Sequence, residues 1–220
     1  MVAGNPPHER RTTLEVSRQR KHAATREDIL VELSLIERAQ QGEAHAIGSL
    51  YESHVGQVRR LLVAILGPGD HIDDLVQDVF LQVFQSIRAF RGDSRFSTWL
   101  HRVASNMALS YLRRKKRTPA MADDTQFPAT AAGQSDTMET RAELSALYAI
   151  LESLSPKRRI AFILFEIEQY TISEIAQMTG TNIATVKSRL FLGRKEILKK
   201  AQNSPILQEL MRESEKGSAQ

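Results

Sequence analysis

The sequence of 220 residues contains no cysteine, which excludes disulfide bonds, thiolate nucleophiles and zinc sites with cysteine ligands. Glycine and proline are also scarce, at 11 and 7 residues, and they are clustered. So few helix breakers favour helices over a strand-rich fold. No apolar run approaches the length that spans a bilayer, and the polar N-terminus lacks the apolar core of a signal peptide. We therefore expect a cytoplasmic protein.

A large excess of either charge is missing as well. The chain has 30 lysines and arginines against 26 aspartates and glutamates, which leaves a net charge of only +4. A nucleic-acid-binding protein with this balance must gather its cations locally, because its surface as a whole is not basic. The length is sufficient for two small domains.

The segment from Thr171 to Lys199 has the residue pattern of a helix-turn-helix. Thr171 and Glu174 match the T-x-x-E capping box, in which a hydroxyl and a carboxylate satisfy unpaired amides at a helix start. Gly180 can end this short helix, because glycine adopts a positive φ without a steric penalty. Asn182 is a good N-cap for the second helix.

The two helices are expected to cross where the side chains are small. Ala176 lies at the predicted closest approach, and Val186 closes the core beneath the turn. The outward face of the second helix carries side chains that bond phosphates and base edges: Thr185, Lys187, Ser188, Arg189 and Arg194. A plain helical hairpin with a solvated basic face is the alternative. The conjunction of capping box, spacing and basic face favours DNA binding.

A predicted helix from Asp70 to Phe90 has two different faces. One face is apolar, whereas the other combines acidic and amide side chains with an exposed leucine: Asp74, Gln77, Asp78 and Leu81. Such a face suits a protein partner, and an ordinary solvated face is the alternative. The adjacent Asp73 and Asp74 have no histidine or second carboxylate cluster at a metal-ligand spacing. We therefore expect no metal site and no cofactor.

Aromatic and basic residues meet in a polar loop, Phe90 to Phe96, and in the helix that follows it. We expect Ser97 to cap this helix, which continues to about Lys116, and Trp99 taken alone is expected in the core. Five cations occupy Arg113 to Arg117, where the helix macrodipole alone would favour them. Aromatics beside cations and amides at a loop-to-helix junction also indicate a stacking platform for unpaired bases.

These patterns predict an all-α fold with two helical domains joined by a flexible acidic linker. The expected order is a disordered basic arm (1–26), a first domain (27–117), the linker (118–139), a second domain (140–201) and a polar tail (202–220). The second domain is predicted to hold four helices that include the helix-turn-helix. Its first two helices span Glu139 to Leu154 and Pro156 to Ile167. The acidic linker suits a positively charged partner channel, and a plain spacer is the alternative.

Three motifs in order resemble bacterial RNA polymerase sigma factors of the sigma-70 family, specifically the extracytoplasmic-function (ECF) group. Asp73 to Phe80 is similar to the family's polymerase-clamp-binding segment, Phe90 to Arg117 to its strand-melting segment, and Ser173 to Leu190 to its minus-35 reader. The resemblance covers about residues 35 to 200. Thr181 to Ala184 departs from the Ile-Pro-Val-Gly that relatives often carry, and the N-terminal arm is longer than the group usually has.

The resemblance implies a non-catalytic initiation subunit that binds core RNA polymerase, directs it to promoters and assists strand opening. Its implied partners are core polymerase and promoter DNA, with an anti-sigma factor as a further candidate. The implied polymerase contacts are Asp74, Gln77, Asp78 and Leu81. The implied minus-10 contacts are Arg91, Ser94, Arg95, Thr98, Arg102 and Asn106, with Arg113 and Arg114 on phosphates. The implied minus-35 contacts are Thr185, Lys187, Ser188, Arg189 and Arg194.

Two other classes of protein stay open at this stage. An autonomous helix-turn-helix repressor or activator would bind operators without polymerase, and it would need its N-terminal half for dimerisation or effector binding. A nucleic-acid-processing enzyme would need a nucleophile, a metal cage or an acid-base pair, and the sequence shows no convincing arrangement of these.

Overall fold

The structure is a computed structural model that describes residues 26–117, 138–205 and 208. Within these residues the chain forms helices and short turns and no strand, in agreement with the predicted all-α fold. Most of the expected basic arm, linker and tail lies outside the described residues. Arg26, expected in the arm, and Met138 and Glu139, expected in the linker, are helical in the structure.

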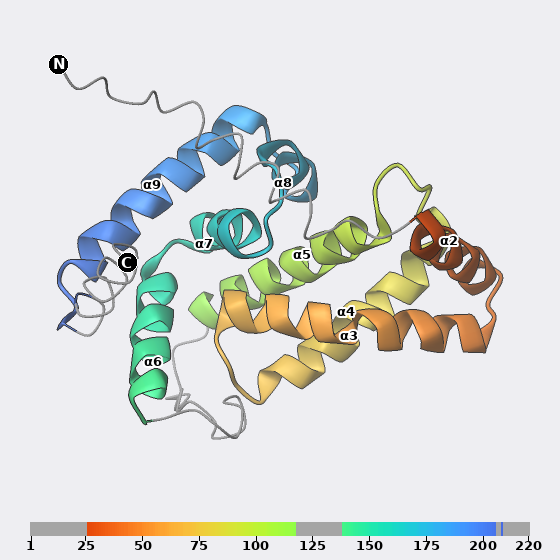
Figure 1. Cartoon of the computed structure of the whole chain (residues 1–220), viewed down its shortest axis with the longest axis horizontal. Helices are drawn as coiled ribbons and strands as arrows, with labels where there is room; N and C mark the ends of the chain where they lie inside the picture. Colours follow the sequence, from red (N-terminus) through yellow and green to blue (C-terminus); the bar gives the residue numbers. More distant parts are fainter. Residues whose placement is uncertain (1–25, 118–137, 206–207, 209–220) are drawn as a thin grey trace, which may run out of the picture.

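The N-terminal domain is a set of helices around one apolar core (Figure 1). Its elements are α2 (Arg26–Gln40), α3 (Ala44–Leu66), α4 (His71–Ser86), a 3-10 turn η1 (Ile87–Ala89) and α5 (Phe96–Arg117). Gly67 ends α3 with a φ of +83°, which a glycine tolerates at this position. The predicted apolar face of α4 is buried in the core: Leu75, Val76, Val79, Phe80 and Val83.

The helix predicted from Asp70 to Phe90 is shorter in the structure, because α4 ends at Ser86 and the chain tightens into η1. The Gln40 amide donates hydrogen bonds to the carbonyls of Ile87 and Phe90, at 3.0 and 2.9 Å. These carbonyls therefore have partners from α2 and need no further α-helical turn.

The start of α5 also differs from the prediction. The helix begins at Phe96, so Ser97 lies inside the first turn and is not its N-cap. The Phe96 ring is buried, and its centroid lies 5.6 Å from that of Phe90 and 5.7 Å from that of Trp99. Burial of Phe96 in this aromatic cluster accounts for a helix start two residues earlier than the capping pattern predicts.

The C-terminal domain contains the predicted four helices among its described residues. They are α6 (Met138–Ser153), α7 (Pro156–Phe162), α8 (Ile172–Met178) and α9 (Ile183–Ala201), with a π-helical turn η2 (Ile163–Ile167) after α7. Pro156 occupies the first position of α7, as its fixed φ favours. The π turn was not predicted, because the apolar spacing of this segment fits a continuous helix equally well.

The helix-turn-helix follows the local signals in the sequence. Thr171 Oγ1 accepts from the Glu174 amide at 3.2 Å, and Glu174 Oε2 accepts from the Thr171 amide at 2.8 Å, so the capping box is complete. Gly180 has a φ of +58° in the turn. Asn182 Oδ1 caps α9 by accepting from the Thr185 amide at 2.7 Å. The capping box fixes where α8 begins, and the Asn182 cap fixes where α9 begins.

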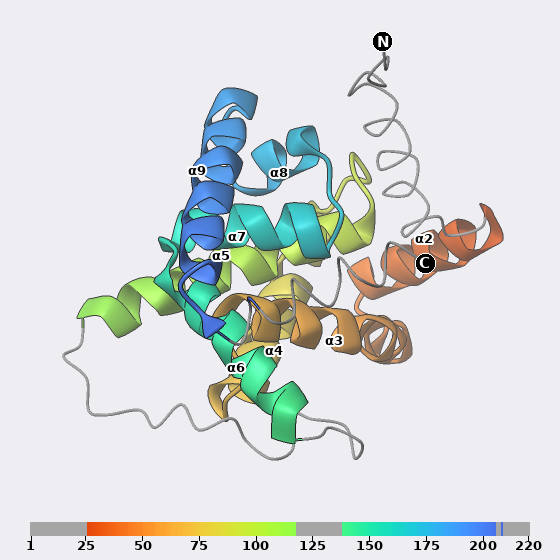
Figure 2. The ribbon, with the colours of Figure 1, turned by 60° about the vertical axis from the view of Figure 1, so that its left-hand side comes forward.

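The two domains pack against each other. Figures 1 and 2 both show α7 and α8 beside α5, and the buried apolar residues of the two domains form one continuous cluster. The helix that carries most of the predicted minus-10 residues is thus also the helix on which the C-terminal domain rests.

Candidate nucleic-acid interface

The outward face of α9 presents most of the predicted minus-35 residues. Lys187 and Ser188 are exposed, while Thr185 and Arg189 are half-buried. Burial lowers the pKa of the Arg189 guanidinium, which nonetheless stays charged, because an arginine pKa starts far above neutrality. Arg189 forms no ion pair with a described residue. Its five donors therefore stay available to a phosphate or a base edge.

The start of α7 adds residues that sequence reasoning did not select. A depression of about 460 Å³ beside α9 is lined by Thr185, Ser188 and Arg189, and on its other side by Ser155, Lys157 and Arg158. Lys157 thus extends the basic surface next to α9. The long sequence separation between α7 and α9 gave no local signal for this contact.

Arg194 does not join the open part of this surface. Its Nε and Nη2 donate to Glu166 Oε1 at 2.8 and 2.5 Å, and its Cζ lies 5.1 Å from the ring centroid of Phe165. Phe191 protrudes instead, with 67% of its surface exposed. It follows Lys187 by four residues and so shares a face with it. The sequence analysis did not select Phe191. Only its exposure in the structure identifies it as a candidate contact.

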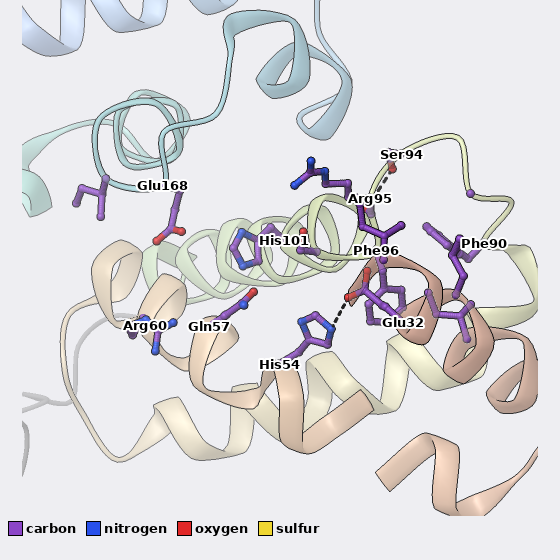
Figure 3. Close-up of a pocket in the computed structure, with 16 residues that line it drawn as sticks. Glu32, His54, Gln57, Arg60, Phe90, Ser94, Arg95, Phe96, His101 and Glu168 are labelled. Atoms are coloured by element: carbon purple, nitrogen blue, oxygen red, sulfur yellow. Dashed lines mark hydrogen bonds and ion pairs between the residues drawn. The ribbon is translucent and has the colours of Figure 1, made fainter. Parts of the chain in front are cut away.

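The loop before α5 borders a cavity of about 620 Å³ (Figure 3). Ser94 and Arg95 of the loop line it, together with Arg60 on α3 and the rings of Phe90 and Phe96. Arg91 is exposed in the same loop but does not line the cavity. The cavity therefore combines aromatic walls with cations at the junction where the sequence predicts binding of unpaired bases.

The aromatics at this junction do not form the open stacking platform that the sequence suggests. Phe90, Phe96 and Trp99 are each buried, at 8%, 1% and 8% exposure. They pack against one another with centroids 5.4 to 5.7 Å apart. Because the rings are packed in the core, only parts of Phe90 and Phe96 face the cavity. Trp99 does not line the cavity and is a core residue, as expected.

Along α5 the remaining minus-10 candidates divide into two groups. Arg102, Asn106, Arg113 and Arg114 are exposed. Thr98 is buried, at 8% exposure, one helical turn before His101, whose Nδ1 lies 2.9 Å from the hydroxyl of Tyr170 in the C-terminal domain. The structure therefore brings Thr98 into the contact between the domains and leaves it closed to a DNA strand.

The outward face of α4 is open, as the predicted partner surface requires. Asp74, Gln77 and Asp78 are exposed, and Leu81 exposes 60% of its surface. Neither Asp74 nor Asp78 forms an ion pair with a described residue. Asp73 differs, because it is held in an ion pair with Arg59 of α3. This surface thus offers two carboxylates, an amide and an apolar side chain to a partner.

In the described part of the chain two features are absent: a cluster of metal ligands and a helix that could cross a membrane. No group of three or more potential ligands among its histidines, aspartates and glutamates lies close enough to hold a metal ion. No helix in the same ranges combines the length and the apolar character that a bilayer crossing needs.

Two family descriptions match the chain: Sigma-70 region 2 over residues 50–118, and Sigma-70, region 4 over residues 144–197. The ECF RNA polymerase sigma-E factor of Haemophilus influenzae is 33% identical over 183 residues, which are 79% of this chain and 96% of that protein.

Two solved structures share the fold at low sequence identity. CnrH in complex with the cytosolic domain of CnrY is similar with a TM-score of 0.59 and 22% identity, over 77% of this chain and 96% of that one. The sigma factor RpoE of Bartonella quintana, in complex with the anti-sigma factor NepR, gives a TM-score of 0.54 and 20% identity, over 70% and 96%.

Proposed function

We propose which residues carry out each step of promoter recognition, on the premise that the chain belongs to the ECF group of the sigma-70 family. Members of this family are non-catalytic subunits that direct RNA polymerase to promoters. Residues 27–117 form the domain that binds core polymerase and the minus-10 element. Residues 140–201 form the domain that reads the minus-35 element. Because the protein acts as a polymerase subunit, its place is the cytoplasm.

Recognition of the minus-35 element rests on the exposed face of α9. Lys187, Ser188 and Arg189 follow the capped start of this helix, and the N-terminal part of a recognition helix is the part that meets base edges in the major groove. Arg189 is the best candidate for a base contact, since it forms no ion pair with a described residue and is half-buried. Phe191 is suited to the apolar methyl group of a thymine, and Lys157 to a backbone phosphate.

Recognition of the minus-10 element rests on the cavity beside the loop Phe90 to Phe96. Its volume of about 620 Å³ is within the usual range for small-ligand pockets, so a single unstacked base can enter it. Arg95 lies at its edge (Figure 3) and is suited to the phosphate of that nucleotide. Arg102 and Asn106 continue the same strand path along α5.

Binding to core polymerase rests on the outward face of α4. Asp74, Gln77, Asp78 and Leu81 form one exposed strip, whose carboxylates suit a basic partner surface and whose leucine suits an apolar contact. An anti-sigma factor is a further partner that the similarity to the RpoE–NepR complex supports.

The single observation that carries the proposal is the presence of both surfaces, the α4 strip and the α9 face, on one chain. Co-purification with core RNA polymerase, followed by run-off transcription from genomic fragments, tests it. We expect stable association and new transcript starts that share a sequence pattern upstream. A double substitution, Lys187→Ala with Arg189→Ala, should leave association with core polymerase intact. The transcript starts should then no longer share an upstream sequence pattern.

Other outcomes would contradict the proposal in distinguishable ways. Specific binding to DNA without any association with core polymerase would show an autonomous regulator. Association with core polymerase without new transcript starts would show that the chain does not recognise promoters. Only the proposed contact of α4 with core polymerase would then stand.

A further inference from the structure

A cavity of about 300 Å³ is lined by cations from three helices. Arg113 comes from the end of α5, Lys157 from the start of α7 and Arg189 from the middle of α9. No carboxylate is among the described residues that line this cavity. Its volume is at the lower end of the range for small-ligand sites. The cavity therefore has the size and the sign of charge that suit a small anion.

The three cations lack the partner that a neighbouring arginine has. Arg158, next to Lys157, donates to Glu196 Oε2 at 3.1 Å. Arg113, Lys157 and Arg189 form no ion pair with a described residue. Like charges that share a cavity repel one another, and partial burial of the Arg189 guanidinium disfavours its charge and lowers its pKa. An anion bound in the cavity would relieve both costs.

A buried hydroxyl is the second, independent feature of this cavity. Ser105 on α5 is only 2% exposed and lines the cavity, and its Oγ has no hydrogen-bond partner among the described residues. Serine hydroxyls on helices can bond to the carbonyl one turn before, as Ser110 Oγ does with the carbonyl of Asn106 at 2.9 Å. A buried hydroxyl without a partner costs free energy. An oxygen of a bound anion could accept from Ser105 Oγ and remove this cost.

The balance of charge indicates a ligand with more than one phosphate. Guanidinium and ammonium groups both donate to phosphate oxygens, and a guanidinium often does so through two bonds. One phosphate ester carries only about 1.5–2 negative charges at pH 7, which is less than three cations can balance. Two adjacent phosphates supply more charge and more acceptor oxygens. The cavity has no aromatic wall for a nucleobase, because its apolar lining consists of Leu109 and Ile160.

We propose that this cavity binds a small diphosphate-bearing anion through Ser105, Arg113, Lys157 and Arg189, and that the bound anion competes with DNA for Arg189. The N-terminal domain supplies the hydroxyl and one cation, and the C-terminal domain supplies the other two cations. The competition rests on the proposed role of Arg189 at the minus-35 element. The anion site itself does not depend on that role.

Two substitutions in the full chain test the site from opposite sides. Ser105→Ala removes the hydroxyl and leaves every charge in place, and Lys157→Gln removes one cation and leaves Arg113 and Arg189. Each has a matched control at an exposed position that does not line the cavity: Ser110→Ala on α5 and Lys195→Gln on α9. Thermal unfolding without ligand shows whether each variant is folded.

The first measurement is calorimetric titration with inorganic pyrophosphate at constant ionic strength and without divalent cations. We expect saturable binding at one site per chain and weaker binding of inorganic phosphate. Ser105→Ala and Lys157→Gln should each weaken pyrophosphate binding about tenfold or more, the factor that corresponds to one hydrogen bond to a charged group. The two control variants should bind as the unsubstituted chain does.

Two results of this titration would overturn the site. One is the absence of saturable binding to the unsubstituted, folded chain. The other is an equal loss of affinity in Lys157→Gln and Lys195→Gln, or no loss in Ser105→Ala, because either would show diffuse attraction to a basic surface.

The second measurement is displacement of a labelled DNA duplex from the free chain by pyrophosphate, again at constant ionic strength. We expect Ser105→Ala, which keeps every cation, to need about tenfold more pyrophosphate for the same displacement than Ser110→Ala. Displacement of the duplex at equal concentrations in both variants would overturn the competition. Run-off transcription with core polymerase and no added pyrophosphate tests the proposed function alone, so the two failures are distinguishable.

Discussion

Arg194 is predicted to act mainly in the C-terminal fold, although the sequence pattern selects it as a DNA contact. Its guanidinium donates twice to Glu166 Oε1 and lies 5.1 Å from the Phe165 ring centroid. The two side chains of the ion pair are 49% and 30% exposed, so the pair contributes only about 0.2–1 kcal/mol. The cation–π contact adds about 0.5–1 kcal/mol.

Arg194→Ala should therefore lower the free energy of unfolding by roughly 1–2 kcal/mol, the sum of these two contributions. For a domain of this size, each kcal/mol corresponds to about 4–8 °C in Tm. Thermal unfolding followed by circular dichroism measures the shift. Lys195→Ala is the matched control, because Lys195 is an exposed neighbour without an ion pair to a described residue.

A double-mutant cycle with Glu166→Gln separates the ion pair from the ring contact. We expect the two substitutions to be non-additive, because each breaks the same pair. If Arg194→Ala unfolds at the same temperature as Lys195→Ala while promoter binding falls, the intramolecular role is wrong and Arg194 contacts DNA directly.

Three further changes test separate parts of the proposed site. Asp78→Arg should weaken association with core polymerase while the free chain stays folded, and Glu52→Arg, the same charge reversal at an exposed position on α3, should not; equal affinities in pull-down titrations would remove Asp78 from the α4 strip. Arg189→Ala should cost about 1–3 kcal/mol of promoter binding and relax preference at one base pair, whereas a uniform loss over all sequences would make Arg189 a phosphate contact. Gly180→Ala should lower stability by about 1–2 kcal/mol in urea titrations, because its φ of +58° is left-handed; Gly180→Asn should cost less, and equal losses would show that this φ is not the cause.

The helix-turn-helix could be predicted from sequence because each of its signals is local. Thr171 and Glu174 are one turn apart, Gly180 fixes the turn by its own φ, and Asn182 caps the helix that it precedes. The polar and apolar faces of α4 were predictable for the same reason, since helical period alone separates them. The roles of the exposed residues on these faces stay predictions.

The differences arise where distant residues decide the structure. The η1 turn depends on Gln40, 47 residues before Ile87. Arg194 meets Glu166 across 28 residues, and Arg159 meets Ile65 across 94. Helical periodicity contains no information on such partners, because it reports only which face of one helix is apolar. The packing of the C-terminal domain on α5, and with it the burial of Thr98, could not be read from the sequence.

The central claim is that this chain recognises promoters only together with core polymerase. The most direct test compares binding of promoter DNA, identified from the run-off transcripts, by the free chain and by the chain with core enzyme at one near-physiological salt concentration. We predict weak, salt-sensitive binding without sequence preference for the free chain, and promoter-specific binding once core enzyme is added. A tight, sequence-specific complex of the free chain with that DNA would contradict the claim and would show an autonomous regulator.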